Sequence, residues 1–171
     1  LGLSDPDSVL QPGEPPGVWN GLGAKFLNLS ETVEADDFRK LFDGYHHVNG
    51  ESLVRNAGLP NRCPGWDLCF SADKTFSICW SAAPPEIRPL FHWIQQQAVQ
   101  ATLDFMQERL AYSRKGKGGT QIVPTRLVAA CVPHAITREL QIGLHTHVCL
   151  LNLGVCDDGS VRTILSRPFF R

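Results

Sequence analysis

The residues best suited to chemistry are three histidines in the last third of the sequence. His145 and His147 are separated by one residue, and His134 precedes them. In a β-strand, residues i and i+2 point to the same face, about 6 to 7 Å apart along the chain. The pair can therefore present two imidazoles side by side, and a neighbouring strand that ends at His134 can supply a third. We expect a metal site here; the alternative is three unrelated histidines.

The ligand type limits the choice of metal. Three neutral imidazoles suit Zn, Ni, Co, Cu or Mn better than Ca. Phosphate oxygens that fill the open coordination positions also admit Mg. The histidines alone therefore predict one divalent metal ion and leave its identity open.

Strand-like segments must position these histidines. Segments 127–134 and 145–153 are strand candidates joined by a polar connection. Asp157-Asp158-Gly159 is a hairpin signal, and 161–165 is the expected returning strand. The last third of the chain therefore predicts antiparallel β-structure around the histidines.

A further strand is expected in the middle of the chain. Segment 66–70 alternates apolar and polar residues and ends in a turn at 71–74. The short apolar run at 75–81 fits either a strand or a helix.

Helical spacing occurs in three places. Segment 19–29 has apolar residues at three- and four-residue steps, and 34–42 has an acidic first turn with Gly44 placed as a C-terminal cap. The longest helix is expected after Pro84-Pro85 and ends near residue 111. One apolar stripe is expected along it, formed by Ile87, Leu90, Phe91, Ile94, Ala98, Ala101, Phe105 and Leu110. We expect an α+β fold, an antiparallel sheet with a long helix packed on one face.

Composition indicates one globular domain of 171 residues, with 43% hydrophobic and 19% charged residues. No apolar run approaches the roughly 20 residues that a membrane helix needs, so no membrane insertion is expected. The six cysteines form no C-x-x-C pair, and we expect reduced thiols in a cytoplasmic protein. The net charge of −1 gives no overall signature of nucleic-acid binding.

Positive charge is concentrated locally. Arg109, Arg114, Lys115 and Lys117 crowd one glycine-rich segment. Such a segment can neutralise DNA phosphates, or it can be a solvated helix end whose cations complement the helix dipole.

Two ordered blocks of sequence then match a known family. Segment 65–77 (GWDLCFSADKTFS) resembles the G-x-D-L-T-F-S-A-P-K-S-x-S block of TrwC/TraI-type conjugative relaxases, members of the histidine–hydrophobic–histidine endonuclease superfamily. Segments 133–138 and 144–153 resemble the H-x-x-x-R and L-H-T-H-V-V-x-x-N-L parts of the same family. Its opening segment is similar to residues 13–21, with a matching turn at 49–51. The resemblance covers nearly the whole chain and implies the relaxase fold.

The resemblance implies roles for individual residues. His134, His145 and His147 match the metal ligands, and Mg or Mn is then the expected functional ion, with Zn, Ni, Co or Cu as alternatives. Asp67 matches the catalytic carboxylate that orients a ligating histidine, acting as an acceptor for its free N–H. A DNA path is expected along Lys74, Arg114, Lys115, Lys117 and Arg138.

The implied reaction is transesterification, in which a tyrosine hydroxyl attacks one phosphate of single-stranded DNA at an origin of transfer. Neither tyrosine of the chain, Tyr45 or Tyr112, matches the family position. We expect the nucleophile upstream of residue 1, and a relaxase catalytic domain over 1–171 that is incomplete at both ends.

The resemblance also implies partners: relaxosome accessory proteins and a coupling protein, around a monomeric enzyme. Three alternatives remain at this point. They are a replication initiator of the same superfamily, a DNA-binding relaxase remnant without its tyrosine, and an unrelated hydrolase that uses the three histidines on water.

Overall fold

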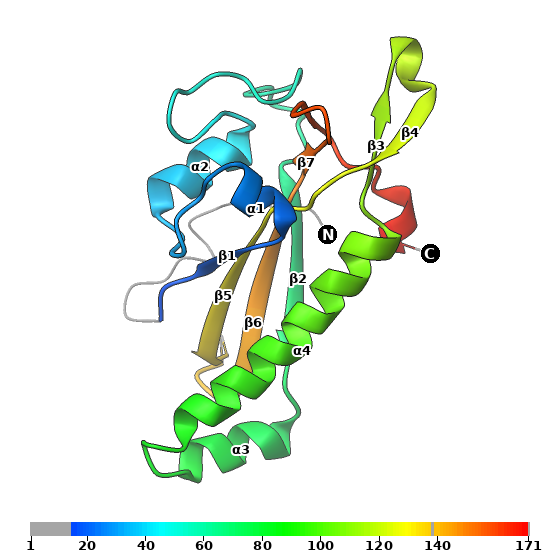
Figure 1. Cartoon of the computed structure of the whole chain (residues 1–171). Coiled ribbons are helices and arrows are strands. Elements are labelled where there is room, and N and C mark those ends of the chain that lie inside the picture. The colour runs from blue at the N-terminus through cyan, green and yellow to red at the C-terminus, as the bar shows by residue number, and fades with distance from the viewer. Residues whose placement is uncertain (1–14, 138, 171) are drawn as a thin grey trace.

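The computed structural model describes residues 15–137 and 139–170. Its centre is a four-stranded antiparallel sheet in the order β1-β5-β6-β2 (Figure 1). The strands are β1 (Val18–Asn20), β2 (Gly65–Ser71), β5 (Ala129–Ile136) and β6 (Ile142–Leu151). The α+β class is confirmed, and the two histidine-bearing segments are the two central strands.

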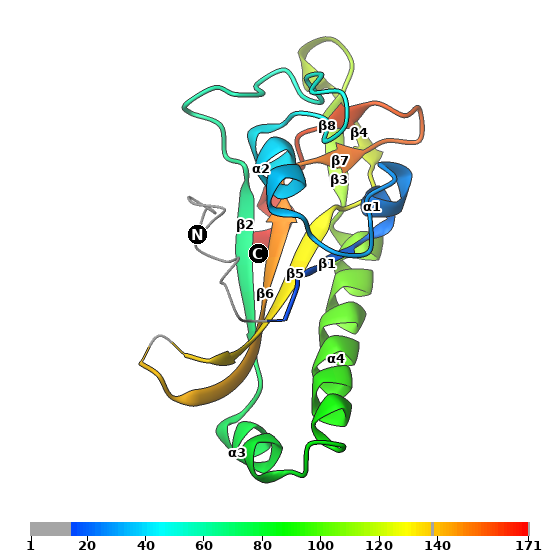
Figure 2. The same ribbon diagram turned by 90° about the vertical axis from the view of Figure 1, so that its left-hand side faces the viewer.

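Helices cover both faces of this sheet (Figure 2). The long helix α4 (Arg88–Arg109) packs on one face through Val99, Leu103 and Met106. The short helices α1 (Leu22–Phe26) and α2 (Ala35–Asp43) pack on the other face. Residues of β5 and β6 alternate between the two resulting cores, as the period of two in a strand requires.

The apolar stripe predicted for α4 is wrong. Leu90, Ile94 and Phe105 are 52%, 42% and 57% exposed. The stripe that packs is formed by the buried side chains Val99, Leu103 and Met106, which also follow three- and four-residue steps. Only the second half of α4 lies against the sheet, while its first half extends past the strands beside α3 (Lys74–Ala82; Figure 1). Periodicity shows that a helix has an apolar side, but the neighbouring element decides which side is buried.

The helix predicted at 19–29 is partly wrong. Trp19 pairs with Ala130 in β1, and the helix α1 covers only the middle of the predicted range. Gly21 separates the two with a φ of 91° and lies so close to the carbonyl of Leu127 that a Cβ would collide with it. Residues 18–20 therefore form a strand, because their pairing with β5 outweighs the helical spacing of the local sequence.

Two other predicted elements agree with the structure. The helix predicted at 34–42 is α2, and Gly44 ends it in the left-handed conformation with a φ of 92°. The ambiguous run 75–81 is the helix α3. Asp73 caps α3, because its carboxylate accepts a hydrogen bond from the amide of Phe76 at 2.9 Å.

The glycine-rich basic segment forms a two-stranded ribbon rather than a loop. Strands β3 (Tyr112–Lys115) and β4 (Gln121–Pro124) pair in it, joined by the short helix η2 (Lys117–Gly119). The ribbon projects from the body of the molecule at the end of α4 (Figure 1).

The end of the chain departs from its prediction in one respect. The turn at 157–159 is present, but the returning strand β8 (Val161–Arg162) is short and pairs with β7 (Gly154–Val155) outside the main sheet. A second short helix, η3 (Arg167–Phe170), follows it. Within residues 15–137 and 139–170, no helix has the length and apolar character to cross a membrane.

Candidate metal centre

The sheet brings the three histidines to one place. His134 on β5 lies directly opposite His145 on β6. The ring centroids of His134 and His145 are 5.3 Å apart, and each lies 5.2 Å from the ring centroid of His147. Three imidazoles bound to one ion at about 2.1 Å per nitrogen and at tetrahedral angles have centroids about 5.3 Å apart. The spacing of the rings therefore fits a shared metal ion.

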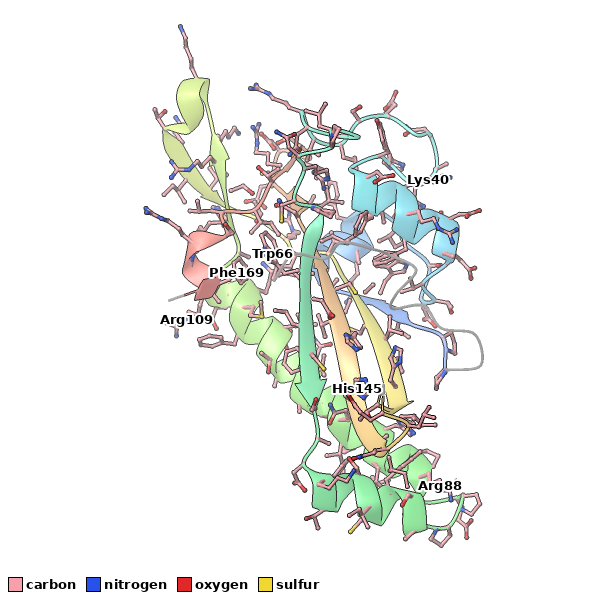
Figure 3. The ribbon with its side chains drawn as sticks, turned by 180° about the vertical axis from the view of Figure 1, so that it is seen from behind. Lys40, Trp66, Arg88, Arg109, His145 and Phe169 are labelled. Carbon is pink, nitrogen blue, oxygen red and sulfur yellow. The ribbon has the colours of Figure 1, made fainter. Side chains whose placement is uncertain are left out.

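The ring orientations are not yet those of a closed site. Among the described residues, no three His, Cys, Asp or Glu side chains form a ready ligand cluster. The backbone fixes the spacing of the rings, and the side chains must turn to aim their nitrogens at one point. His134 is 5% exposed, whereas His145 and His147 on β6 are half-buried. Figure 3 shows His145 on this strand.

Hydrogen bonds orient two of the rings. The Nδ1 atom of His147 lies 2.9 Å from both carboxylate oxygens of Asp67. The Nδ1 atom of His145 lies 2.8 Å from the carbonyl oxygen of Gly143. An Nδ1–H that donates to an oxygen leaves the Nε2 lone pair free for a metal. Both rings therefore have the tautomer that a ligand needs.

The register of β2 against β6 explains the place of Asp67. Cys69 is directly opposite His147, and Asp67 is two residues earlier on β2, on the same face of the sheet. The carboxylate thus reaches His147 diagonally across the strands, a separation that long or polar side chains can bridge.

Strand alternation separates this centre from the core. On the face that bears the histidines, Cys149 and Leu151 continue β6 beneath α2 and are fully buried. Burial raises the pKa of the Cys149 thiol well above its ordinary value, and the charge of Asp67 raises it further. The six cysteines are all free, and Cys63, Cys69 and Cys79 are exposed.

The expected DNA-binding residues are divided between two ends of the molecule. Lys74 at the start of α3 donates a hydrogen bond to the carbonyl of Ile142 at 2.8 Å, at the end of β6 that leads into the histidines. Arg138 lies outside the described residues. Arg114, Lys115 and Lys117 lie on the ribbon, at the opposite end of the molecule from His145 (Figure 3).

The ribbon cations differ in their partners. Lys115 forms an ion pair with Asp158 at 2.6 Å, and this contact lowers the pKa of the carboxyl. The guanidinium of Arg114 donates to the carbonyl of Gly119 at 3.2 Å and is otherwise exposed, as is Lys117. Arg114 and Lys117 are therefore more available to a partner than Lys115.

The two tyrosines lie away from the histidines. Tyr45 is in the connection after α2, with its hydroxyl against Gly58. Tyr112 begins the ribbon strand β3. Neither element belongs to the histidine end of the sheet.

With this geometry established, comparisons with known proteins identify the family. A family model described as TrwC relaxase matches residues 7–171. The chain belongs to the TrwC relaxase family. The multifunctional conjugation protein TraI of Escherichia coli (strain K12) is 31% identical over 153 residues, which cover 88% of this chain and 8% of TraI.

Solved structures of the relaxase TrwC are similar to this chain throughout. A metal-bound complex of TrwC with oriT DNA has a TM-score of 0.77 at 31% identity and covers 90% of this chain and 53% of TrwC. A copper-bound complex has a TM-score of 0.76 at 32% identity and covers 90% of this chain and 52% of TrwC. A TrwC complex with a 27-mer DNA, comprising the recognition hairpin and the cleavage site, has a TM-score of 0.75 at 31% identity, with coverages of 89% and 54%. The chain thus spans about half the length of these structures.

One contact in this relaxase centre was missed by sequence reasoning. The backbone carbonyl of Gly143 orients His145. Because it is a main-chain group, no residue type could have signalled it.

Proposed function

We propose that this chain is the catalytic domain of a conjugative relaxase, which nicks one DNA strand at an origin of transfer and so begins conjugative transfer. The observation that carries the proposal is the triangle of three imidazoles with His147 held by Asp67, on a fold of the TrwC relaxase family. TrwC itself has been solved with oriT DNA, both metal-bound and metal-free.

His134, His145 and His147 are the proposed ligands of one divalent ion, with Mg or Mn as the functional ion and Zn, Ni, Co or Cu as alternatives. The spacing of the rings supports a shared ion, and the copper-bound TrwC structure shows that a relative binds a first-row transition metal. When bound, such an ion neutralises charge on a phosphate oxygen and makes the phosphorus easier to attack.

The residues of this chain have distinct proposed tasks. Asp67 is the catalytic-site carboxylate that accepts the Nδ1–H of His147 and keeps the ring from turning. The carbonyl of Gly143 does the same for His145. With Nδ1–H donated to these oxygens, the Nε2 atom of each ring is the one left to bind the ion.

DNA is proposed to contact two separate regions. Lys74 belongs to the region around the histidines, where the single strand would place its cleavage site. Arg138, outside the described residues, is proposed as a DNA contact from its motif match alone. Arg114, Lys115 and Lys117 belong to the ribbon, and a two-stranded ribbon can enter the major groove of a duplex. The TrwC complex with both a recognition hairpin and a cleavage site agrees with two separated contacts of this kind.

The attacking hydroxyl is proposed to come from a tyrosine outside residues 1–171. Tyr45 and Tyr112 both lie on elements away from the histidine end. The 171 residues would then bind metal and DNA as an incomplete catalytic domain without forming a covalent link. A covalent DNA adduct of this chain on a denaturing gel would instead make Tyr45 or Tyr112 the nucleophile.

The setting of the enzyme is part of the proposal. We infer a monomer in the cytoplasm that works with relaxosome accessory proteins and a coupling protein. Six free cysteines suit a reducing compartment.

The experiment that tests this function measures single-stranded DNA binding with and without Mn²⁺ at constant ionic strength, by fluorescence anisotropy. If the ion engages a phosphate, Mn²⁺ will tighten DNA binding by the wild-type chain and have no such effect on His147→Ala. His46→Ala is the matched control, because His46 lies in the loop after α2 and should keep the wild-type response. An equal response to Mn²⁺ in all three proteins would reject the role of the histidines. A chain that binds no DNA under any condition would reject the relaxase function.

A further inference from the structure

A second cavity lies behind the histidines, on the opposite face of the sheet. Thr146 stands between His145 and His147 on β6, so its side chain points to the other face. There it lines a cavity of about 320 Å³ between α4 and the β1–β5 edge of the sheet. The other lining residues are Pro16, Val18, Asn20, Gln96, Gln97, Val99, Gln100, Cys131 and Pro133.

The lining has an unusual chemistry: within residues 15–137 and 139–170 it contains four primary amides and no charged side chain. Asn20 donates a hydrogen bond to Gln100 at 2.7 Å, and Gln100 in turn donates to Asp104 at 2.8 Å. These bonds hold two of the amides in fixed orientations. Gln96 and Gln97 are exposed, and their side chains make no hydrogen bond to any residue that the structure describes, so these side-chain amides are available to a ligand.

The buried hydroxyl of Thr146, in the wall of this cavity, is a hydrogen-bonding group without a partner among the described residues. Thr146 is 3% exposed, and its Oγ1 has no partner within residues 15–137 and 139–170. Its cross-strand neighbours are Pro133 on β5 and Phe70 on β2, neither of which has a polar side chain. Buried hydroxyl groups in proteins almost always have a partner, so this group calls for a water molecule or a ligand.

From these observations we propose that the cavity binds a nucleobase. A volume of about 320 Å³ is at the lower end of small-molecule pockets, a size that suits a single base. Primary amides match the adjacent donor and acceptor on a base edge, as Asn and Gln do with adenine. Val99, Cys131 and Pro133 supply apolar contact for the flat faces of the ring.

The absence of charge in the lining separates this ligand from others of similar size. The lining residues that the structure describes include no cation, so they offer no charged partner for a phosphate or a carboxylate. It therefore takes the base rather than the phosphate of a nucleotide. An unstacked base of a bound single strand and a free nucleoside present the same chemistry to it.

The base site goes beyond the proposed relaxase function, because none of its residues is a proposed metal ligand. The experiment is therefore carried out with EDTA present. The chain is labelled with ¹⁵N and titrated separately with adenosine, guanosine, cytidine and thymidine, while the side-chain amide signals of Asn and Gln are followed by NMR. At least one nucleoside is expected to shift the signals of Gln96, Gln97 and Gln100.

Variants then test the cavity itself. Thr146→Val removes the hydroxyl at nearly constant volume, and losing one neutral hydrogen bond should weaken nucleoside binding roughly three- to tenfold. Thr102→Val is the matched control, since Thr102 is on α4 outside the cavity and bonds within its own helix. Gln97→Leu provides a second test that does not disturb the core, because Gln97 is exposed.

The outcomes are distinct. If no nucleoside shifts these amides at millimolar concentration, or if Thr146→Val and Gln97→Leu both bind as tightly as wild type, the cavity holds only water and the proposal is overturned. A single-stranded oligonucleotide that displaces the nucleoside identifies a base of bound DNA as the ligand. Nucleoside binding that persists beside the oligonucleotide identifies a free nucleoside. Either of these two results supports the site, whatever the metal experiments show.

Discussion

The two ends of strand β6 lie in one continuous ladder but have opposite roles. At the covered end, Cys149 and Leu151 are fully buried beneath α2. At the open end, on the same face, His145 and His147 stay partly exposed and form the proposed metal centre. Backbone pairing with β2 and β5 is regular from Cys149 to His145, and the register of β5 against β6 shifts only beyond His134 and His145. What differs is whether a helix covers the side chains.

Packing at the covered end fixes the strand register that brings the histidines together at the open end. A slip of one residue in the pairing of β5 and β6 would turn every side chain to the other face. Because helices cover both faces of β5 and β6, such a slip would move the side chains of each core into the other, and the packing of both cores opposes it. The register that places His134 opposite His145 is thus set by residues that take no part in chemistry. A site on strands anchored in this way is held more rigidly than one built on loops.

The largest predicted effect is a loss of stability at the covered end. Phe38 of α2 is fully buried and contacts Trp19 and Phe42. Phe38→Ala should lower the free energy of unfolding by about 3 to 5 kcal/mol, from lost burial and the cavity left behind. Urea denaturation measures this loss, with Phe26→Ala as the control because Phe26 is 48% exposed. Equal losses in the two variants would mean that α2 is not the cover described above.

The next effect is expected at the open end and concerns metal affinity rather than stability. His145→Ala removes a proposed ligand, which should weaken Mn²⁺ binding by more than about 100-fold, the upper range for losing only a supporting contact. Isothermal titration calorimetry measures the affinity, and His46→Ala is the control. Because His145 is not part of either core, the unfolding free energy should change little. Unchanged metal binding in His145→Ala would remove His145 from the centre.

A smaller effect is expected from the residue that supports the centre. Asp67→Asn keeps the size of the side chain but replaces the carboxylate that accepts from His147. Metal affinity should fall about 10- to 100-fold, because the ring loses its fixed orientation and some basicity. Asp36→Asn is a suitable control, since the side chain of Asp36 is 86% exposed and lies on α2. If both variants bind metal equally well, Asp67 has no role in holding the ligand.

The sequence was sufficient to predict most of this open end. The spacing of His145 and His147 placed both rings on one face, and the strands that carry them were recognisable from their apolar pattern. It was not sufficient for α4, because several stripes of apolar residues exist on that helix and only contact with the sheet selects one. It also failed for Trp19, whose pairing partner in β5 lies more than a hundred residues away.

The position of the ribbon also could not be predicted from the sequence. The basic segment lies between the two motif blocks in the chain, and one DNA path was expected along this segment, Lys74 and Arg138. The intervening helix α4 has 22 residues and spans about 33 Å at 1.5 Å per residue. It begins at the histidine end, beside α3, and carries the chain to the other end of the molecule (Figure 1). The basic segment is therefore close to the motif blocks in the sequence but far from the histidines in space.

That separation leads to the smallest predicted effect, which concerns the ribbon alone. Arg114 and Lys117 are its most available cations, whereas Lys115 is already paired with Asp158. Each phosphate contact contributes about −0.7 to the slope of log affinity against log salt for single strands, and about −0.9 for duplex DNA. Replacing Arg114 and Lys117 with Ala should therefore flatten the slope by up to about 1.4 on single-stranded DNA or 1.8 on a hairpin duplex. Fluorescence anisotropy over a salt series measures the slope, with Lys25→Ala as the control because Lys25 is an exposed lysine on α1 and not on the ribbon.

The same double variant tests whether the two ends of the molecule are independent. Its Mn²⁺ affinity should equal that of the wild type, because the histidines lie on the four-stranded sheet and the ribbon strands β3 and β4 form a separate sheet. A slope that flattens more on the hairpin than on the single strand would assign the ribbon to the duplex part of the DNA. An unchanged slope on both substrates would show that the ribbon is only a solvated projection, and that DNA binding depends on the histidine end alone.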